Sequence, residues 1–282
     1  MIAICPNPYR DTDLKLTRET ERLLGDSGFE TVICPIFAES GDAVLPDDIE
    51  TRSLSAMAGE LSLAVVIGGD GTILSAAREL PGVEVPLLGV NLGTMGFMAS
   101  LEPDQLPLIV KAAKGEYRES ARMLLEVSLR RGEEVLYRGR ALNDAVIHGC
   151  GDTIHLNASC DGTAITTFRG DGIIVSTPTG STGYSMSAGG PIVEPEADNI
   201  IISPICAHTI SSKCFVLSKN RTVSVTAERL HNRGAYLSVD GVTVADVCKG
   251  DVLTAFRAEH RLIIADMGVK SFYETAFEKL IN

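Results

Sequence analysis

The pentapeptide Gly68-Gly69-Asp70-Gly71-Thr72 is the part of the chain best suited to chemistry. It follows the apolar run Leu63–Ile67, and a helical pattern follows it at Ile73–Leu80. Glycines at a strand-to-helix turn let a phosphate approach the backbone, and the helix start offers N–H groups and the positive end of a dipole. The candidate phosphate-binding residues are therefore Gly68, Gly69, Gly71 and Thr72.

Asp70 is unexpected in such a turn, because its carboxylate would repel a phosphate. Its presence makes sense if it faces a hydroxyl nucleophile or a metal ion. A simpler alternative is that Asp70 and Thr72 only cap the helix. The pattern is neither a Walker A loop nor GxGxxG, so the spacing alone does not choose between these interpretations.

A second candidate segment opens after the predicted strand Ile173–Val175. Residues 176–185 read Ser-Thr-Pro-Thr-Gly-Ser-Thr-Gly-Tyr-Ser, which offers many hydroxyl donors for phosphate and sugar oxygens without adding charge. Tyr184 adds an aromatic face on which a base can stack. The alternative is a Ser/Thr-rich surface loop. Gly189-Gly190-Pro191 follows at once, and this further close-approach pattern favours a constrained site.

The first third of the chain alternates strand and helix patterns, which predicts a parallel sheet with ligands at the carboxyl ends of its strands. The expected strands are Ile2–Cys5, Thr31–Ile36, Leu63–Ile67 and Val85–Val90, and the expected helices are Asp11–Leu24, a polar helix within Asp47–Ala58, Ile73–Leu80 and Pro103–Lys114.

From about Arg122 the pattern changes to short strands with hairpin turns at Asp161-Gly162 and Asp240-Gly241. The expected strands are Leu124–Leu129, Ala141–Ile147, Ile154–Ala158, Ala164–Phe168, Gly172–Ser176, Ile200–Ile205, Thr222–Thr226, Ala235–Val239 and Val252–Ala255. We therefore expect an α/β domain over 1–120 and a mostly β domain over 121–265. A helical pattern at 271–281 suggests that 266–282 packs back on the first domain.

Charge and composition exclude several classes of function. The chain carries 25 Lys+Arg against 37 Asp+Glu, a formal net charge of -12, so its surface repels nucleic acids and anionic lipid headgroups. No apolar run is long enough for a transmembrane helix, and Pro6 and Pro8 interrupt any signal-peptide core. The seven scattered cysteines have no metal-ligand spacing and indicate a reducing, cytoplasmic location. We expect no nucleic-acid and no membrane partner.

Together the motifs resemble those of the bacterial NAD kinases, in order and over nearly the whole chain. The matching stretches are PNPYRD (6–11), GGDGT (68–72), NLGTMGF (91–97), ALNDAVI (141–147), DGIIVSTPTGSTGYSMSAGGPI (171–192), SPICAHT (203–209) and SVDG (238–241). The stretch at 171–192 is specific, whereas lipid kinases and phosphofructokinases carry loops similar to GGDG. This chain departs from the family pattern at Gly183, where Ala is usual, and at Val242, where a polar residue is common.

The resemblance implies an N-terminal α/β domain, a C-terminal all-β domain and a kinase activity. The γ-phosphoryl group of ATP would pass to the 2′-hydroxyl of the adenosine ribose of NAD, with a divalent cation such as Mg²⁺, in a homodimer or homotetramer. Asp70 would be the catalytic proton acceptor. The implied NAD-binding residues are Asp70, Gly71, Phe97, Asn143, Asp144, Arg169, Asp171, Thr182, Gly183, Tyr184, Ser185 and Ser187. Asp144 is a shortened variant, because many members have Glu there.

Two rival functions come from other classes. A lipid kinase that shares the GGDG loop would need an apolar or basic surface facing a membrane, which this acidic chain does not show. A nucleotide-binding regulator that has lost catalysis would keep the fold, but loss of activity usually removes the acidic residue first, and Asp70 is present. For the metal, Asp70 or Asp144 can supply one ligand, and ATP phosphates and water supply most of the others.

Overall fold

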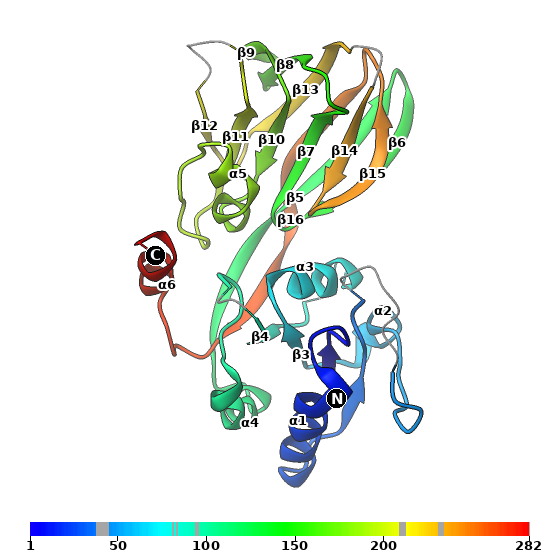
Figure 1. Cartoon of the computed structure of the whole chain (residues 1–282), viewed down its shortest axis with the longest axis vertical. Helices are drawn as coiled ribbons and strands as arrows, with labels where there is room; N and C mark the ends of the chain where they lie inside the picture. The colour runs from blue at the N-terminus through cyan, green and yellow to red at the C-terminus, as the bar shows by residue number, and fades with distance from the viewer. Residues whose placement is uncertain are drawn as a thin grey trace. The chain divides into compact units, whose positions relative to one another are not determined.

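The computed structural model describes residues 1–37, 45–80, 82, 84–93, 96–208, 213–230 and 234–281 (Figure 1). The chain forms two compact units, one of Met1–Ala121 with Leu262–Asn282 and one of Arg122–Arg261. The borders fall inside two strands, β5 (Arg118–Arg131) and β16 (Val252–Asp266). The sequence places these borders at 120/121 and 265/266. Residues 94, 95 and 209, which belong to two of the motifs, lie outside the described part.

The first unit is built on parallel strands whose residues are almost all buried. These are β1 (Ile2–Pro6), β2 (Thr31–Ile33), β3 (Leu63–Gly68) and β4 (Leu87–Asn91), in the spatial order β2-β1-β3-β4. Near-continuous apolar runs such as Leu63–Ile67 suit strands that are covered on both faces. Because the strands are parallel, β3 and β4 end at the same edge of the sheet, with Gly68 paired to Asn91.

Helices cover both faces of this sheet (Figure 1). On one face, α1 (Lys15–Asp26), η3 (Pro103–Leu108) and α4 (Ile109–Ala113) contribute Leu24, Leu106 and Ile109 to a common core with the strands. On the other face, Ile73 of α3 (Asp70–Glu79) packs so closely on Gly89 of β4 that a side chain there would collide with it. A short helix, α2 (Leu54–Met57), with η2 (Ala58–Glu60) lies beside α3.

Several predicted helices differ from the observed ones; the one expected over Pro103–Lys114, for example, is the 3-10 helix η3 followed by the short helix α4. The helix expected from Asp11 begins only at Lys15, after the turn η1 (Thr12–Leu14), because Leu14 and the residue before it take positive φ angles (51° and 57°). It then continues through Gly25 to Asp26, since a glycine within a helix costs only about 1 kcal/mol. The polar helix expected within 47–58 is reduced to the single turn α2, which has one buried side chain, Leu54.

The second unit is a sandwich of two β-sheets. One sheet contains β5, β6 (Glu134–Ala141), β8 (Ile154–Cys160), β9 (Thr163–Gly170), β13 (Thr222–Arg229) and β16. The other has the order β12-β11-β10-β7-β14-β15, from β12 (Phe215–Ser218), β11 (Asn199–Ile205), β10 (Gly172–Ser176), β7 (Asp144–Gly149), β14 (Ala235–Val239) and β15 (Val242–Val247). Alternate side chains from both sheets meet in one apolar core, which includes Leu125, Ile147, Val175, Val225 and Leu237. The predicted fold class is confirmed.

The hairpin turns explain how this second unit brings distant segments together. Asp161 and Asp240 both have left-handed φ angles (49° and 46°), and each is followed by a glycine that also has positive φ. This is the backbone that an Asp-Gly two-residue turn requires, so both predicted hairpins are confirmed. The β14–β15 hairpin therefore places Asp240 at one end of the six-stranded sheet, where β14 pairs with β7.

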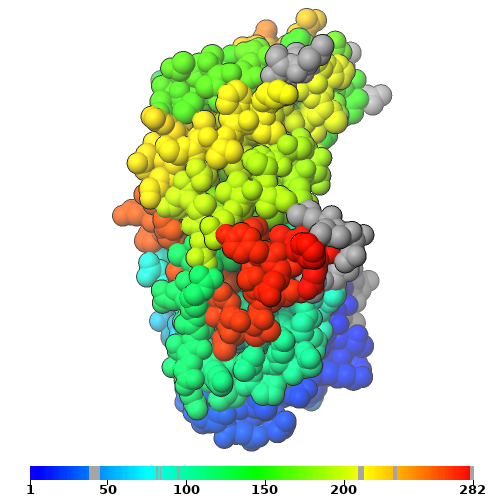
Figure 2. Space-filling model, turned by 90° about the vertical axis from the view of Figure 1, so that its left-hand side faces the viewer, coloured from blue at the N-terminus to red at the C-terminus, as the bar shows by residue number. Residues whose placement is uncertain are grey.

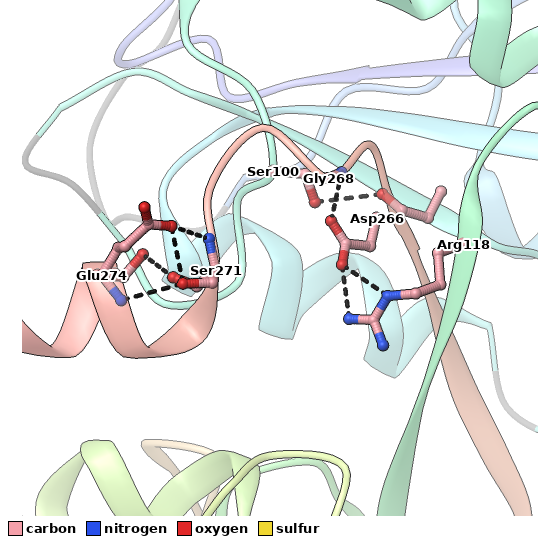
Figure 3. A network of polar contacts seen from close by, with 8 residues as sticks. Ser100, Arg118, Asp266, Gly268, Ser271 and Glu274 are labelled. Carbon is pink, nitrogen blue, oxygen red and sulfur yellow. Dashed lines mark hydrogen bonds and ion pairs between the residues drawn. The ribbon is translucent and has the colours of Figure 1, made fainter.

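The C-terminal helix α6 (Phe272–Ile281) belongs to the first unit and lies at its surface, in red in Figure 2. Figure 3 shows how the segment before it is fixed: Arg118 donates to Asp266 Oδ2 (2.7 Å), and Ser100 donates to the carbonyl of Ala265. Ser271 and Glu274 then exchange hydrogen bonds in the manner of a capping box. No helix in the described part of the chain is long and apolar enough to span a bilayer.

Candidate active site

The GGDGT turn lies at the carboxyl end of β3, in the first unit. Gly69 is extended, and α3 begins at Asp70. Gly68 has no space for a side chain because Thr72 packs against it, and the Thr72 hydroxyl accepts a hydrogen bond from Asn7 Nδ2 (3.1 Å). Gly68 and Thr72 are therefore buried, whereas Gly71 is exposed at the start of the helix. The part of the turn open to a ligand is its middle, residues 69–71.

The Asp70 carboxylate is held by a segment 27 residues further along the chain. Its Oδ2 accepts the backbone N–H of Phe97 (2.8 Å), and its Oδ1 accepts that of Met98 (3.2 Å). A side chain at Gly96 would collide with the same carboxylate. Asp70 thus links α3 to the end of the NLGTMGF motif, a role that the simple helix-cap alternative does not describe. A carboxylate has about four lone-pair sites, so both oxygens can accept a further donor.

Phe97, the expected adenine contact, is half-buried and faces α6. Its ring centroid lies 6.1 Å from that of Phe272, and the Lys279 ammonium lies 4.4 Å from its centroid, a cation–π geometry. Neither Phe272 nor Lys279 was singled out from the sequence as a site residue. The available signal was the helical spacing of apolar residues at the end of the chain, with Phe272 on the apolar side.

In the second unit, Asn143 lies in the turn between β6 and β7, Asp144 is the first residue of β7, and Asp240 holds the backbone of both. The Asp240 carboxylate accepts the N–H groups of Leu142 (2.8 Å), Asn143 (2.7 Å) and Asp144 (3.1 Å). The Asp240 N–H donates to the Asp144 carbonyl (3.0 Å) in return. Charge-assisted bonds of this kind are among the stronger ones in proteins. Sequence analysis identified Asp240 as a turn residue but missed this positioning role.

The hydroxyl-rich segment packs on the same turn from another side. The Thr177 hydroxyl donates to the Leu142 carbonyl (2.5 Å), and the Thr177 N–H donates to the Asn143 carbonyl (2.9 Å). A side chain at Gly180 would collide with the Asn143 carbonyl. A Cβ built on Gly183 would lie 3.7 Å from Asn143 Nδ2, an ordinary contact, but only 3.3 Å from the Gly180 carbonyl oxygen, so the alanine that is usual at this position would require that carbonyl to shift by a few tenths of an ångström. The hydroxyl-rich segment and the Asn143-Asp144 segment, which the sequence identified separately, therefore pack directly against each other.

Burial gives the Asn143-Asp144 pair unusual properties. The side chain of Asp144 is buried, and this burial, followed by the nearby Asp240 carboxylate, raises the pKa of Asp144 to about 7. The Oδ1 atom of Asn143 is buried and has no hydrogen-bond partner within the described residues. A buried amide oxygen without a partner is costly, and a ligand donor at this position would satisfy it.

The remaining predicted NAD-binding residues fall into two groups. Tyr184 and Ser187 are exposed and Thr182 is half-exposed, whereas Ser185 is buried and its hydroxyl bonds that of Ser203 (2.9 Å). Ser185 therefore contributes to packing within the described structure. The pKa of Tyr184 is raised by burial, and further by charges that include Asp171 and Asp144, so these groups lie within electrostatic range of one another.

Arg169 and Asp171 flank the turn from β9 to β10. Arg169 is exposed, and its Nε donates to the Thr153 hydroxyl (2.7 Å). Asp171 faces the Cys206 thiol, whose pKa it raises by accepting a hydrogen bond. Cys206 has a left-handed φ of 45°, which is uncommon for a residue other than glycine and bends the chain sharply after β11.

No group of three or more His, Cys, Asp or Glu side chains within the described residues is arranged to hold a metal ion. Mg²⁺ is commonly held by substrate phosphates and water with one or two carboxylates. Asp70, with lone pairs to spare on both oxygens, suits that role, and so does the buried Asp144.

A glycine-rich turn with a fixed carboxylate, in a parallel α/β unit joined to a β-sandwich, is the arrangement of a two-domain phosphotransferase. Residues 2–117 match the family model of the ATP-NAD kinase N-terminal domain, and residues 142–266 match that of the C-terminal domain. The chain belongs to the NAD kinase family, which confirms the resemblance. Among curated relatives, an NAD kinase of Geobacter metallireducens is 41% identical over 77% of this chain and 78% of its own length. One of Ectopseudomonas mendocina is 35% identical over 95% and 90%.

Two solved structures share the fold. An NAD kinase from Archaeoglobus fulgidus in complex with ATP superposes with a TM-score of 0.76 at 25% identity, over 100% of this chain and 99% of that one. Yeast NADH kinase complexed with NADH superposes with a TM-score of 0.87 over 99% and 86%, and at 23% identity it supports the fold alone.

Proposed function

We propose that this chain transfers the γ-phosphoryl group of ATP to the 2′-hydroxyl of the adenosine ribose of NAD, which produces NADP. The observation that carries the proposal is the match of both domains to the ATP-NAD kinase family, together with Asp70 in the GGDGT turn. The rival lipid kinase loses its basis, because the match to the NAD kinase family extends over both domains.

Asp70 is the proposed proton acceptor. A carboxylate is a weak base for a ribose hydroxyl. It suffices here because phosphoryl transfer has a loose transition state in most analyses, so the proton leaves late and positioning dominates. The hydrogen bonds from Phe97 and Met98 support this role, since they fix the direction of the carboxylate before the substrate binds.

The Asn143-Asp144 turn and the 182–187 segment are the proposed NAD-binding elements. The unpartnered Oδ1 of Asn143 supports a hydrogen bond from a substrate donor. The exposed ring of Tyr184 offers a stacking surface, and Arg169 and Asp171 complete the expected set. Phe97 is the proposed adenine contact, although its ring already packs against Phe272 and Lys279.

Mg²⁺ is the proposed cation, and when bound with ATP it neutralises phosphate charge. Either Asp70 or Asp144 is the side chain proposed to reach it. We also infer a cytoplasmic homodimer or homotetramer. The location is supported by seven free cysteines, which suit a reducing compartment. Light scattering after gel filtration measures the assembly directly.

The test is to incubate the purified chain with ATP, Mg²⁺ and NAD and to follow NADP with an NADP-specific dehydrogenase. We expect kcat/KM for NAD at least about a hundredfold above that for diacylglycerol or fructose 6-phosphate, which corresponds to about 3 kcal/mol. Comparable turnover of a lipid or sugar phosphate would overturn the substrate assignment. Binding of NAD without turnover would support the rival reading, a regulator that has lost catalysis.

A further inference from the structure

The loop after β1, residues 7–11, is anchored on the GGDGT turn. Asn7 is buried, its N–H donates to the Ile67 carbonyl (2.8 Å), and its side-chain amide donates to the Thr72 hydroxyl (3.1 Å). The Asn7 carbonyl then accepts the N–H of Arg10 (3.0 Å) and that of Asp11 (2.9 Å). Arg10 therefore leaves a loop whose position is fixed by β3 and α3.

The Arg10 guanidinium lies across the ends of β3 and β4. Its Nη1 donates to the Leu92 carbonyl (3.2 Å), just after β4. A Cβ built on Gly69 would lie 3.6 Å from this Nη1, and one on Gly93 would lie only 2.6 Å away. Gly93 has a φ of 148°, a backbone that other residues rarely adopt. Glycine at position 93 lets the guanidinium lie directly against the backbone there, whereas a Cβ at position 69 would make only an ordinary contact with it.

Charge explains why such a group is needed there. The chain carries a net charge of -12, so a polyphosphate is bound only where local donors outweigh the overall repulsion. Arg78, the basic residue of α3, sits in the last turn of that ten-residue helix. At 1.5 Å per residue it is about 12 Å from the phosphate end.

We propose that Arg10 binds the triphosphate of the nucleotide donor. A guanidinium presents a planar fork of N–H donors that suits phosphate oxygens, and its charge does not depend on pH near neutrality. The inference rests on the proposed kinase activity and assigns Arg10 to the donor rather than to NAD. In a loose transition state, negative charge moves towards the leaving ADP, so a cation here lowers the barrier as well as improving binding.

The experiment measures NADP formation for Arg10→Ala and Arg10→Lys, with Arg22→Ala as the matched control. Arg22→Ala removes the same charge from the same unit, but Arg22 pairs with Asp26 on the exposed side of α1. We expect Arg10→Ala to raise the KM for ATP about tenfold to a hundredfold and to lower kcat, with the KM for NAD within about threefold of wild type. Lysine restores the charge but not the fork, so Arg10→Lys falls between.

Calorimetry with ATP in the absence of NAD shows whether the substitution acts on donor binding. We expect the Kd for ATP to rise about tenfold or more in Arg10→Ala while that for adenosine stays unchanged. An unchanged KM and Kd for ATP, or a rise only in the KM for NAD, would overturn the assignment. Equal losses for ATP and adenosine would also overturn it, since they would indicate a folding defect. Wild-type turnover is the internal reference: if wild type makes no NADP, the kinase proposal itself has failed, whatever Arg10 does.

Discussion

The carboxylate of Asp240 lies 2.7 Å from the backbone nitrogen of Asn143, and the two residues are 97 positions apart in the chain. The same carboxylate also accepts the N–H groups on either side of Asn143, at 2.8 and 3.1 Å. The turn at the end of a hairpin therefore fixes the backbone of the proposed NAD-binding pair. Asp240 is a positioning residue, because it acts through Asn143 and Asp144 rather than on the substrate.

Replacing Asp240 with alanine should mainly weaken NAD binding. Three backbone donors lose a charged acceptor, and the Asn143-Asp144 turn is released from its fixed position. We expect the KM for NAD to rise about tenfold or more, with the KM for ATP within about twofold, because a charge-assisted hydrogen bond contributes about 1.5–3 kcal/mol. Asp240→Asn keeps one acceptor oxygen and should recover part of the loss. Steady-state kinetics with each substrate varied in turn provides the measurement.

Asp161 provides the matched control for this prediction. It occupies the equivalent place in the other Asp-Gly hairpin, with a similar φ of 49°, and its carboxylate also accepts a backbone N–H, from Thr222 at 2.9 Å. Asp161→Ala should lower stability slightly and leave both KM values unchanged. If Asp240→Ala behaves in the same way, Asp240 supports only the fold and the positioning role is wrong.

Asn143→Ala tests whether the pair holds the substrate. The Asn143 Oδ1 is buried and has no partner among the described residues, so removing the side chain costs the free protein little and costs the complex a hydrogen bond. We expect the KM for NAD to rise by about tenfold, for a loss of about 1.5 kcal/mol. Asn157→Ala, which removes an exposed amide that bonds Thr167 on the same unit, should change neither constant. An unchanged KM with a collapsed kcat would reverse the roles of Asn143 and Asp70.

Local patterns in the sequence predicted much of the fold. The buried run Leu63–Ile67 predicted β3, because five consecutive apolar residues suit a strand that is covered on both faces. Both Asp-Gly turns were predicted correctly, because a two-residue hairpin turn requires positive φ angles and both pairs have them. Two strands were underestimated: β5 and β16 have 14 and 15 residues, although only 124–129 and 252–255 were expected. Charged residues interrupt the apolar pattern, at Arg118, Glu119 and Arg122 in β5 and at Arg257, Glu259 and Arg261 in β16, which conceals a long strand.

The contacts that build the candidate site were beyond local patterns. The bond from Phe97 to Asp70 and that from Asn143 to Asp240 join segments 27 and 97 residues apart. Which residues meet in such pairs depends on how the strands are aligned with one another, and this alignment does not follow from local sequence patterns. The position of Arg10 near the GGDGT turn could not be predicted for the same reason, because it depends on the buried amide of Asn7.

Asp144 should make the stability of the protein depend on pH. Its pKa is raised by burial from 3.8 to about 7, so the folded state retains a proton that the unfolded state has released. The resulting stabilisation is complete below about pH 4 and is lost as the pH rises through about 7. Asp144→Asn removes this loss. The free energy of unfolding of Asp144→Asn minus that of wild type should therefore increase by about 1–3 kcal/mol between pH 5 and pH 8.

Urea unfolding at pH 5 and pH 8 measures this difference. Asp161→Asn is the control: Asp161 is exposed, and a hydrogen bond from the Thr222 N–H lowers its pKa. It is ionised in both states across this range, so its substitution should have the same effect at both pH values. A pH-independent difference for Asp144→Asn would show that the carboxyl is already ionised in the folded protein near pH 5.

Asp70→Asn tests the assignment of the chemistry. If Asp70 takes the proton of the 2′-hydroxyl, the loss of its charge and basicity should lower kcat by at least about a hundredfold, the lower end of general-base contributions. NAD binding, measured by calorimetry, should change by less than about tenfold. The substitution has a structural cost as well, because an amide offers a single acceptor oxygen to the N–H groups of Phe97 and Met98. A loss of stability of about 1–3 kcal/mol is therefore expected.

This structural cost must be separated from the loss of the base. Asp161→Asn also replaces a carboxylate whose two oxygens accept hydrogen bonds, from Thr222 and Arg221, and it should lose some stability while keeping its kcat. The kcat of Asp70→Asn is compared with that of Asp161→Asn at a temperature well below the melting temperatures of both variants, so that unfolding does not contribute. If Asp70 serves mainly as a metal ligand, a higher Mg²⁺ concentration restores much of the rate. If it serves only to hold the 96–98 segment, kcat stays near wild type while stability falls, and the general-base assignment is then wrong.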